Sequence, residues 1–429
     1  MPLKCINISY VRIIPIDKLG IMCYFIPSYF IGNRRVIYVL VYADNAATTK
    51  ISDSALKAMM PLFKEDYGNP SSLHSIGQKA KEYLEKARAD IAECINAEPS
   101  TIYFTSGGSE ADNQALRSAA YMGKKKGKTH IISSKFEHHA ILHTLNALEK
   151  EGFTVTLLDV YSNGIVKPED VKNAITDKTC LVTIMTANNE IGTIQPIKKI
   201  GAICREKGVL FHTDAVQAAG HIPLDVKDMN IDMLSISGHK FHGPKGVGAL
   251  YVRKGIILTN IIFGGAQERK KRAGTENVPA IVGMATALKD AVANMEKNSE
   301  YVANLRDKMI AGLKDIPKSR INGDLQHHLP GTLNMCFEGI EGEGILLWLD
   351  QKGIEASSGS ACTSGSLDPS HVLLAIGVPV EVAHGSLRLS ISEYNTEEEI
   401  DHIIKTVPQV VSYLREMSPV WEKMMEEEK

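Results

Sequence analysis

Short β-rich runs alternate with helix-length segments from Val41 to about Arg253, and this alternation constrains the fold more than any other feature. Strand–helix alternation predicts a mainly parallel sheet with helices on both faces. Ser75 to Ala97 has apolar residues at helical spacing with charges between them, which predicts an amphipathic helix. The other expected helices lie at about 110–122, 139–151, 168–176 and 196–207. The seven expected strands are Ile102–Thr105, His130–Ser133, Val155–Val160, Leu181–Thr186, Val209–Thr213, Met233–Ser237 and Gly248–Arg253.

The pattern changes after Arg253 and predicts a second, α+β domain. A chain of 429 residues exceeds the size that a single hydrophobic core fills. We therefore expect a large domain at 50–290 and a small domain made of 39–49 and 291–429. The later elements expected are a long helix from about Pro279 to Leu313, a strand at Thr332–Phe337, a helix at Glu343–Asp350, a strand at Leu387–Ser392 and a last helix from about Thr396.

Residues 1–38 are apolar and aromatic but have no regular pattern. Asp17, Lys18, Arg34 and Arg35 interrupt the segment, and its uncharged stretch from Leu19 to Asn33 is short for a membrane span. The order of charged and apolar residues fits a signal peptide poorly. We expect an extension outside the fold; a membrane-touching anchor and an integral strand or helix are the alternatives.

Charge and cysteine usage limit the possible partners and compartments. The formal net charge of −2 gives no reason to expect nucleic acid or an anionic membrane as a partner. Seven cysteines, an odd number with no Cys-x-x-Cys pair, argue against a secreted disulfide framework and favour the cytoplasm. Their spacing matches neither a zinc finger nor an iron–sulfur ligand set, so no metal is expected.

The segment that follows the first expected strand resembles an anion-binding turn. In open parallel sheets, ligands bind beyond the carboxyl ends of the strands. Ser106–Glu110 (SGGSE) follows one strand and opens a helix, where Gly108 lets backbone N–H groups approach a phosphate and Ser109 adds a hydroxyl. An ordinary turn with Ser109 as the helix N-cap is the alternative reading.

Three further strand ends carry ionisable residues. Asp214 ends a buried strand, where a carboxylate needs a cation such as a protonated pyridine nitrogen, although N-capping would also explain it. Lys240 follows another strand in a turn rich in glycine, serine and histidine, where desolvation would make its amine a nucleophile; a structural lysine is the alternative. His138 could stack on a flat cofactor or shuttle protons. His139 and His143 stand four residues apart but have no third metal ligand at helical spacing.

Together these strand ends indicate a cofactor. A turn for a phosphate, an Asp for a ring nitrogen and a Lys for an aldehyde occur in the order and fold that pyridoxal phosphate requires.

The chain resembles the cysteine desulfurases of the NifS/IscS type, within the class-V aminotransferase superfamily of pyridoxal-phosphate enzymes of fold type I. The similarity runs from about Tyr42 to the last helix. It rests on seven segments in register: Asp44–Thr49 (DNAATT), Gly68–His74 (GNPSSLH), Phe104–Glu110 (FTSGGSE), Asn188–Gly192 (NNEIG), Ser237–Lys240 (SGHK), Arg272–Asn277 (RAGTEN) and Ser357–Ser364 (SSGSACTS). Serine stands at 109 where the family usually has threonine, and residues 1–38 have no counterpart in the family.

The resemblance implies a role for each matching residue. Lys240 forms a Schiff base with the cofactor aldehyde, Asp214 pairs with the pyridine nitrogen, and His138 stacks on the ring and helps proton transfer. Arg388 clamps the substrate carboxylate through its two-pronged guanidinium. The other implied contacts are Gln217 and Asn189 to the ring oxygen, and Gly108, Ser109, Ser237, His239 and, from the other subunit of a homodimer, Thr275 to the phosphate.

Cys362 defines the expected chemistry. It lies among small residues, Ser357–Ala361 and Thr363–Ser366, and a mobile loop of this kind could carry one thiol from substrate to acceptor. The resemblance implies that L-cysteine becomes L-alanine while its sulfur passes to Cys362 as a persulfide. An iron–sulfur scaffold or a tRNA-thiolation enzyme would then accept the sulfur. Another class-V reaction and a catalytically idle scaffold protein are the rival interpretations.

Overall fold

The computed structural model describes residues 28–31, 34–37, 39–358 and 369–427, and the chain divides into two units, Met1–Val39 and Leu40–Lys429. In the first unit, β1 (Ser28–Ile31) and β2 (Arg34–Ile37) pair antiparallel in a two-stranded sheet of their own. No helix among the described residues is long and apolar enough to cross a membrane. Whether 1–38 can be dispensed with stays a prediction.

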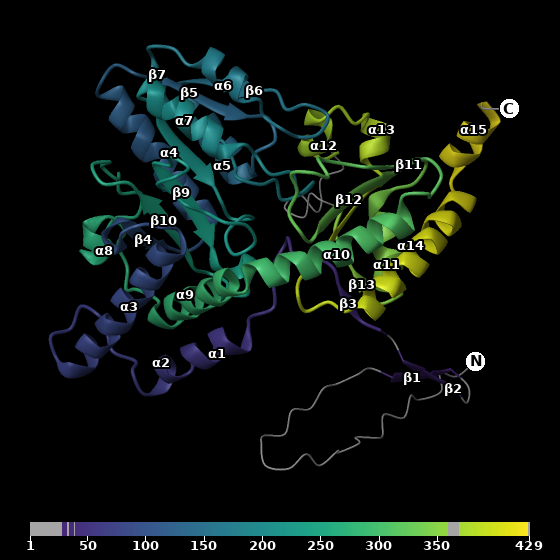
Figure 1. The fold of residues 1–429 in the computed structure, drawn as a ribbon, viewed down its shortest axis with the longest axis horizontal. Helices are drawn as coiled ribbons and strands as arrows, with labels where there is room; N and C mark the ends of the chain where they lie inside the picture. Colours follow the sequence, from purple (N-terminus) through teal and green to yellow (C-terminus); the bar gives the residue numbers. More distant parts are fainter. Residues whose placement is uncertain (1–27, 32–33, 38, 359–368, 428–429) are drawn as a thin grey trace. The chain divides into compact units, whose positions relative to one another are not determined.

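The second unit contains the seven-stranded sheet that the alternation predicted, and Figure 1 shows it with its helices on both faces. Its order is β4-β10-β9-β8-β7-β5-β6, in which only β10 runs antiparallel to its neighbours. The strands are β4 (Ile102–Thr105), β5 (His130–Ser134), β6 (Thr154–Leu158), β7 (Thr179–Thr183), β8 (Leu210–Asp214), β9 (Met233–Ser237) and β10 (Gly248–Val252). The mainly parallel α/β fold is therefore confirmed.

Neighbouring strand residues belong to different hydrophobic clusters, as expected for strands covered on both faces. Ile131 and Leu181 pack with α4 (Gly108–Lys124) and α5 (His139–Lys150), whereas Ile132 and Val182 pack with the helices of the opposite face. The remaining helices of this region are α1 (Asp53–Met59), α2 (Pro61–Lys64), α3 (Ser75–Cys94), α6 (Pro168–Ala174), α7 (Ile197–Lys207), α8 (Gln267–Lys270) and α9 (Val278–Ala293).

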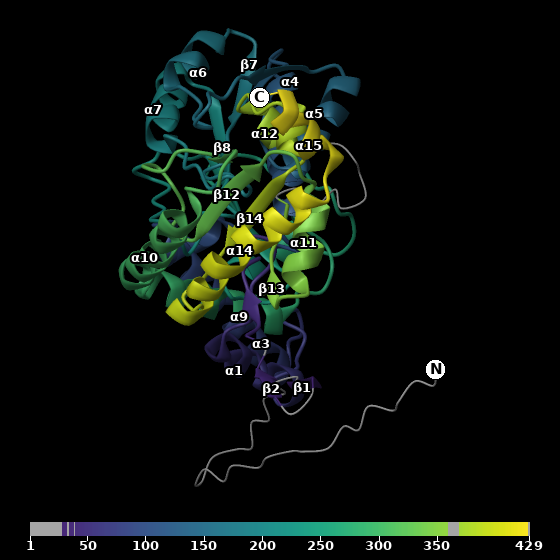
Figure 2. The same ribbon diagram turned by 90° about the vertical axis from the view of Figure 1, so that its right-hand side faces the viewer.

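A second sheet, ordered β11-β12-β14, has its own hydrophobic cluster. It consists of β11 (Ser319–Ile321), β12 (Thr332–Phe337) and β14 (Ser386–Ser390), and α10 (Met295–Leu313), α11 (Gly342–Asp350) and α14 (Glu397–Glu416) pack around it in Figure 2. The shorter elements are β3 (Val41–Tyr42), β13 (Ile354–Glu355), α12 (His371–Ala375), α13 (Val380–Ala383) and α15 (Pro419–Glu427). The separate cluster is consistent with a small domain of 39–49 and 291–429, but this boundary stays a prediction.

One local prediction was wrong, and one alternative reading is excluded. The long helix from Pro279 to Leu313 is two helices, because Asn294 adopts non-helical backbone angles between α9 and α10 and its side chain bonds back to the Asp290 carbonyl. Ser109 is not an N-cap, because α4 begins one residue earlier and Gly107 occupies the cap position.

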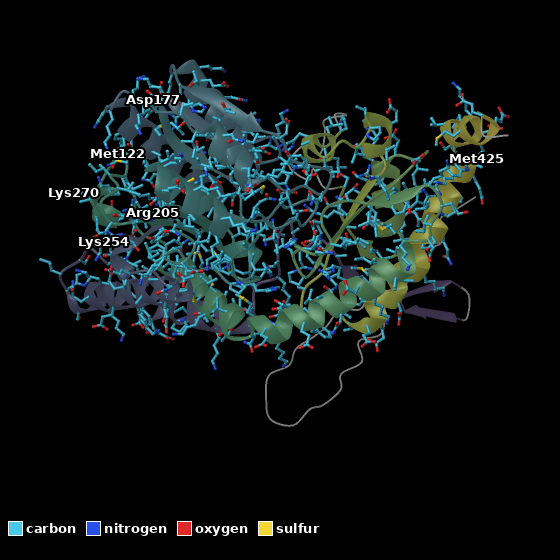
Figure 3. The ribbon with its side chains drawn as sticks, turned by 45° about the horizontal axis from the view of Figure 1, so that its top comes forward. Met122, Asp177, Arg205, Lys254, Lys270 and Met425 are labelled. Carbon is cyan, nitrogen blue, oxygen red and sulfur yellow. The ribbon has the colours of Figure 1, made fainter. Side chains whose placement is uncertain are left out.

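Charges of both signs lie on the outside of the α/β region. Figure 3 shows Asp177, Arg205, Lys254 and Lys270 there, and all four residues are exposed. Arg205 and Lys254 each pair with a carboxylate, of Asp232 and Glu98 respectively. This mixture of charges agrees with the small net charge of the chain.

Candidate active site

A cavity of about 430 Å³ lies at the carboxyl ends of the strands of the large sheet. Segments at the carboxyl ends of five strands, β4, β5, β7, β8 and β9, and Arg388 from the second sheet contribute to its wall. The lining residues are Ala46, Ala47, Gly108, Ser109, Asp112, His138, His139, Met185, Asn189, Glu190, Asp214, Val216, Gln217, Ser237, His239, Lys240, His371 and Arg388. The fold thus brings ten of the predicted site residues to one cavity.

Lys240 reaches this cavity from the turn that follows β9. Its Nζ donates hydrogen bonds to two backbone carbonyls, of Ala46 at 2.5 Å and Ala47 at 2.8 Å. Those carbonyls belong to the segment Asp44–Thr49, almost two hundred residues earlier in the chain. The two carbonyl groups therefore orient the Lys240 amine by accepting its hydrogen bonds.

Asp214 ends β8 inside the cavity wall and is 5% exposed. Its Oδ1 accepts the Val216 N–H at 2.9 Å, and burial raises its pKa above the ordinary value of a carboxyl group. Asp112, on α4, is also buried, and its pKa is raised by burial and by the nearby Asp214. Oδ1 of Asp112 has no hydrogen-bond partner. Two buried carboxyl groups at one end of a cavity favour a cationic occupant there.

The start of α4, which also lines the cavity, fits a phosphate. Gly108 and Ser109 are the first two residues of α4, where backbone N–H groups carry no intrahelical bond and the helix dipole is positive. A side chain at 108 is excluded, because an added Cβ would lie 2.6 Å from Val216 Cγ2. Glu110 fixes the turn by accepting the Ser106 N–H and pairing with Arg272. Buried carboxyl groups, an anion-binding helix start and a lysine in the lining of one cavity match pyridoxal phosphate.

His138 caps α5 and lines the same cavity. Its Nδ1 accepts the Ala140 N–H at 3.1 Å, so in the neutral ring the proton is on Nε2. Burial, with the nearby Lys240, lowers the pKa of His138 to about 4, and the ring is therefore neutral near pH 7. A neutral, flat ring suits stacking on an aromatic cofactor, and its Nε2–H can donate a hydrogen bond.

Arg388 lies on β14 and is 2% exposed. Its guanidinium donates to the Asn189 carbonyl at 2.9 Å and to the Asp44 carboxylate at 2.8 Å. The group is thus oriented by two fixed partners at the wall of the cavity. A planar guanidinium in this position can hold a carboxylate with two parallel hydrogen bonds.

The other two predicted residues are Thr275 and Cys362. Thr275 is exposed and does not line the cavity, and its contact with the phosphate of another subunit stays a prediction. Cys362 lies outside the described residues. Gln217 lines the cavity, but its amide nitrogen donates to the Ala46 carbonyl, which leaves its oxygen for other contacts. Cys94, Cys180, Cys204 and Cys336 have pKa values raised by burial to about 11 or 12, so their thiols are poor nucleophiles.

Sequence reasoning missed several lining residues. Asp112 had a signal, because it is a charged residue on the apolar face of a helix. His371 had none, and it lies 4.7 Å, ring centre to ring centre, from His139, which itself stacks on His143. Even so, no group of three or more His, Cys, Asp or Glu side chains in the described part of the chain could hold a metal ion.

Comparisons with known proteins identify similar chains. Residues 41–403 match the family described as aminotransferase class-V. The chain is 56% identical to a cysteine desulfurase IscS from Clostridium botulinum over 388 residues, 90% of this chain and 98% of that one. It is 54% identical to a cysteine desulfurase IscS from Methanosarcina thermophila over 89% of this chain and 95% of that one.

Solved structures agree with the sequence relatives. A structure titled NifS-like protein aligns with a TM-score of 0.83 and 40% identity, covering 88% of this chain and all of the other. A NifS-like protein from Rickettsia africae aligns with a TM-score of 0.79 and 31% identity over 87% of this chain and all of that one.

Proposed function

This chain belongs to the class-V aminotransferase family, and on that premise we propose that it converts L-cysteine to L-alanine, with Lys240 holding pyridoxal phosphate and Cys362 receiving the sulfur. Its identity to IscS proteins over most of its length makes it a cysteine desulfurase of the NifS/IscS type, an enzyme of sulfur mobilisation. The observation that carries the residue assignment is that Lys240, Asp214 and Arg388 meet in one cavity.

The cofactor would be held at three points. Asp214 would pair with the ring nitrogen, Lys240 would bind the aldehyde, and the turn at Gly108 and Ser109 would bind the phosphate. The other cofactor contacts proposed are Asn189, Gln217, Ser237, His239 and stacking by His138. When bound, pyridoxal phosphate supplies an electron sink for the reaction at the substrate α-carbon.

The protein groups divide the remaining work. Arg388 and Asn189 would hold the substrate carboxylate and so fix the α-carbon next to Lys240. Released from the cofactor by the incoming amine, Lys240 would take the α-proton, and the neutral His138 would help proton transfer. The Cys362 thiolate would attack the substrate sulfur: an S–S bond forms, the Cβ–S bond breaks, and its electron pair stays with the carbon that becomes the methyl group of alanine.

We also propose a homodimer in which Thr275 of the partner subunit completes the phosphate site. Several large apolar or aromatic side chains are exposed in the described part of the chain: Leu73 is 94% exposed, Phe263 84%, Tyr67 66% and Phe63 57%. Apolar side chains exposed to this degree are typical of surfaces that pack against another chain. The odd number of cysteines without a Cys-x-x-Cys pair supports a cytoplasmic location. The proposed sulfur acceptor is an iron–sulfur scaffold or a tRNA-thiolation enzyme.

The test is Cys362→Ser, because a serine hydroxyl cannot accept sulfane sulfur. The variant should keep cofactor absorbance and respond spectrally to cysteine, but should release no sulfide or alanine. Cys94→Ser is the matched control and should retain full turnover, since burial raises the pKa of that thiol to about 11. Undiminished alanine production by Cys362→Ser would refute the persulfide assignment, and keto-acid formation by the wild type would favour transamination.

A further inference from the structure

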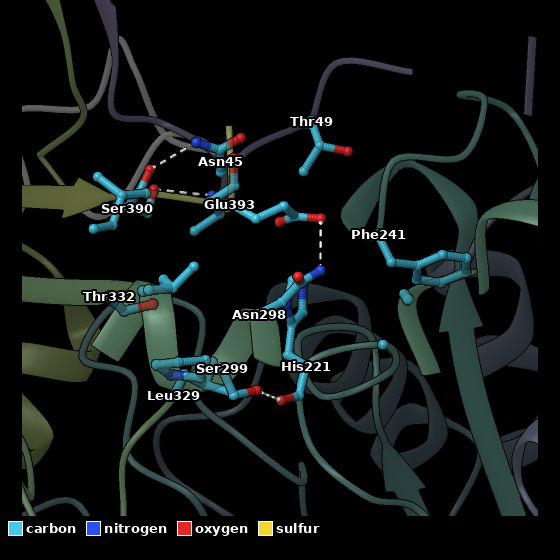
Figure 4. Close-up of a pocket in the computed structure, with 18 of the residues that line it drawn as sticks. Asn45, Thr49, His221, Phe241, Asn298, Ser299, Leu329, Thr332, Ser390 and Glu393 are labelled. Carbon is cyan, nitrogen blue, oxygen red and sulfur yellow. Dashed lines mark hydrogen bonds between the residues drawn. The ribbon is translucent and has the colours of Figure 1, made fainter. Parts of the chain in front are cut away.

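A second, smaller cavity of about 50 Å³ lies behind the Lys240 cavity and shares Ala46 and Gln217 with it. Figure 4 shows residues of its walls: Thr49, His221 and Phe241 lie outside the strands, whereas Thr332 is on β12, Ser390 is on β14 and Glu393 follows β14 by three residues. His242 also lines this cavity. It stands two residues after Lys240, and Glu393 stands five residues after Arg388.

His242 has a strained backbone that its surroundings hold in place. Its φ of 64° lies in the left-handed region, which costs a non-glycine residue energy. Its backbone N–H donates to Thr49 Oγ1 at 2.8 Å, and its carbonyl accepts the Ser52 N–H at 2.9 Å. The turn that carries Lys240 is therefore tied to the chain at two points, through a residue in a conformation that it would not adopt alone.

The contacts of the His242 ring determine its charge. Nδ1 lies 2.9 Å from the Lys50 carbonyl, which can only accept, so Nδ1 carries a proton. Nε2 lies 3.4 Å from Glu393 Oε2. A neutral ring would turn a lone pair toward that carboxylate, and two acceptors would face each other. The arrangement is favourable when both nitrogens are protonated and the ring is a cation.

Glu393 is placed to receive this cation. Its other oxygen accepts a hydrogen bond from Asn298 Nδ2 at 3.4 Å, a contact that joins the carboxylate to α10. Burial raises the pKa of Glu393, but His242, a backbone hydrogen bond and His221 together more than offset this, and the net pKa is lowered. At 3.4 Å the contact with His242 is longer than a good hydrogen bond, so charge attraction dominates it. The titratable neighbours of the pair are His221 and Tyr394.

We propose that His242 and Glu393 form a charged pair, here called the latch, that positions the Lys240 turn against the segment following Arg388. His242 and Glu393 are therefore positioning residues for the reaction. A second contact supports the same turn, because His221 Nε2 bonds to the Lys240 carbonyl at 3.0 Å and Ser299 holds His221. Arg388 is fixed independently, since its strand pairs with β12 along five residues. Loosening the latch would therefore displace the amine and leave the carboxylate clamp in place. The inference rests on the proposed roles of Lys240 and Arg388.

The charge of His242 is tested directly in the wild-type protein. With ¹⁵N-labelled histidine, and with the His242 signal assigned by its loss in His242→Gln, both ring nitrogens should carry protons at neutral pH. In Glu393→Gln the same ring should become neutral. A neutral His242 in the wild type would overturn the proposal, whether or not the protein releases sulfide.

Kinetics test the positioning role. Glu393→Gln should lower kcat for cysteine about tenfold and change KM by less than about twofold, because only the amine is displaced. The double variant His242→Gln/Glu393→Gln should be no slower than the slower single variant. Glu341→Gln is the matched control, since Glu341 faces His384 on the surface at 3.9 Å, and its kcat should be unchanged. Additive losses in the double variant, or a rise in KM with kcat unchanged, would refute the latch. A wild type that produces no sulfide from cysteine would instead refute the proposed function.

Discussion

Arg388 Nη2 and Asp44 Oδ1 are 2.8 Å apart, although 344 residues separate them in the sequence. The pair joins the segment whose carbonyls hold Lys240 to the strand that would bind the substrate carboxylate. Because Arg388 is 2% exposed and also donates to the Asn189 carbonyl, the guanidinium is oriented before any substrate arrives. This preorganisation lowers the cost of binding a carboxylate.

Arg388→Lys should therefore weaken substrate binding, although the substitution keeps the positive charge. Lysine keeps the positive charge but cannot make two parallel hydrogen bonds or retain both present partners. We expect KM for cysteine to rise about 10- to 100-fold, the equivalent of one or two charge-assisted hydrogen bonds. Cofactor absorbance should not change. Arg117→Lys, on the outer part of α4, is the control, and an unchanged KM for Arg388→Lys would remove Arg388 from the substrate site.

Lys240→Ala should abolish turnover and the covalent attachment of the cofactor. The side chain is the one lysine that lines the cavity in the described part of the chain. Borohydride treatment followed by mass spectrometry should find the cofactor on the Lys240 peptide of the wild type and on no peptide of the variant. Lys245→Ala, five residues along the same turn and exposed, should behave as the wild type. A normal, reducible linkage in Lys240→Ala would show that the assignment is wrong.

The sequence predicted the large sheet well because each strand is covered on both faces, so apolar runs and helical segments alternate clearly. It could not predict the strand order. The antiparallel insertion of β10 between β4 and β9 depends on which edges meet, and no local pattern records this. The break at Asn294 was also hidden, since apolar spacing continues on both sides of it.

Site residues at strand ends could be predicted because the chemistry of a parallel sheet is concentrated there. The carbonyls of Ala46 and Ala47 could not, since the side chain of alanine carries no signal and backbone groups are invisible in a sequence. Glu393 and His242 were missed for a different reason. Their proposed role depends on a contact between residues 151 positions apart in the sequence, and each is an ordinary polar residue when read alone.

Phe263→Asp should weaken the proposed homodimer. Burying a carboxylate in place of a phenyl ring at an apolar interface carries a desolvation penalty of several kcal/mol, enough to raise the dissociation constant by at least about 100-fold. Sedimentation at several protein concentrations would measure this. Ile257→Asp is a control of similar exposure farther from Thr275 in the sequence. A wild type that sediments as a monomer at all concentrations would refute the dimer and the role of Thr275 in it.

Deletion of residues 1–38 should leave folding and activity intact. The segment lacks a regular apolar pattern, and the class-V aminotransferase match begins at residue 41. The shortened chain should have the same unfolding midpoint and the same kcat/KM for cysteine within about twofold. Loss of soluble protein on truncation would show instead that the extension is part of the folded structure.

His138 should make the cofactor-free protein less stable in acid. Burial lowers its pKa to about 4 from an ordinary value of 6.5, so between these pH values the unfolded chain binds a proton that the folded chain does not. The stability is fully present above pH 6.5 and is lost as the pH falls toward 4, by about 3 kcal/mol over the whole window. His212 and His239, with pKa values lowered by burial to about 3 and about 4, add to the same loss.

The difference between His138→Gln and the wild type therefore isolates the contribution of His138. Urea unfolding at pH 7 and at pH 4.5 should show a smaller acid loss in the variant, while the exposed control His327→Gln should lose as much as the wild type. Equal losses in His138→Gln and wild type would mean that folding does not lower the pKa of His138, and this would refute its burial in a neutral form.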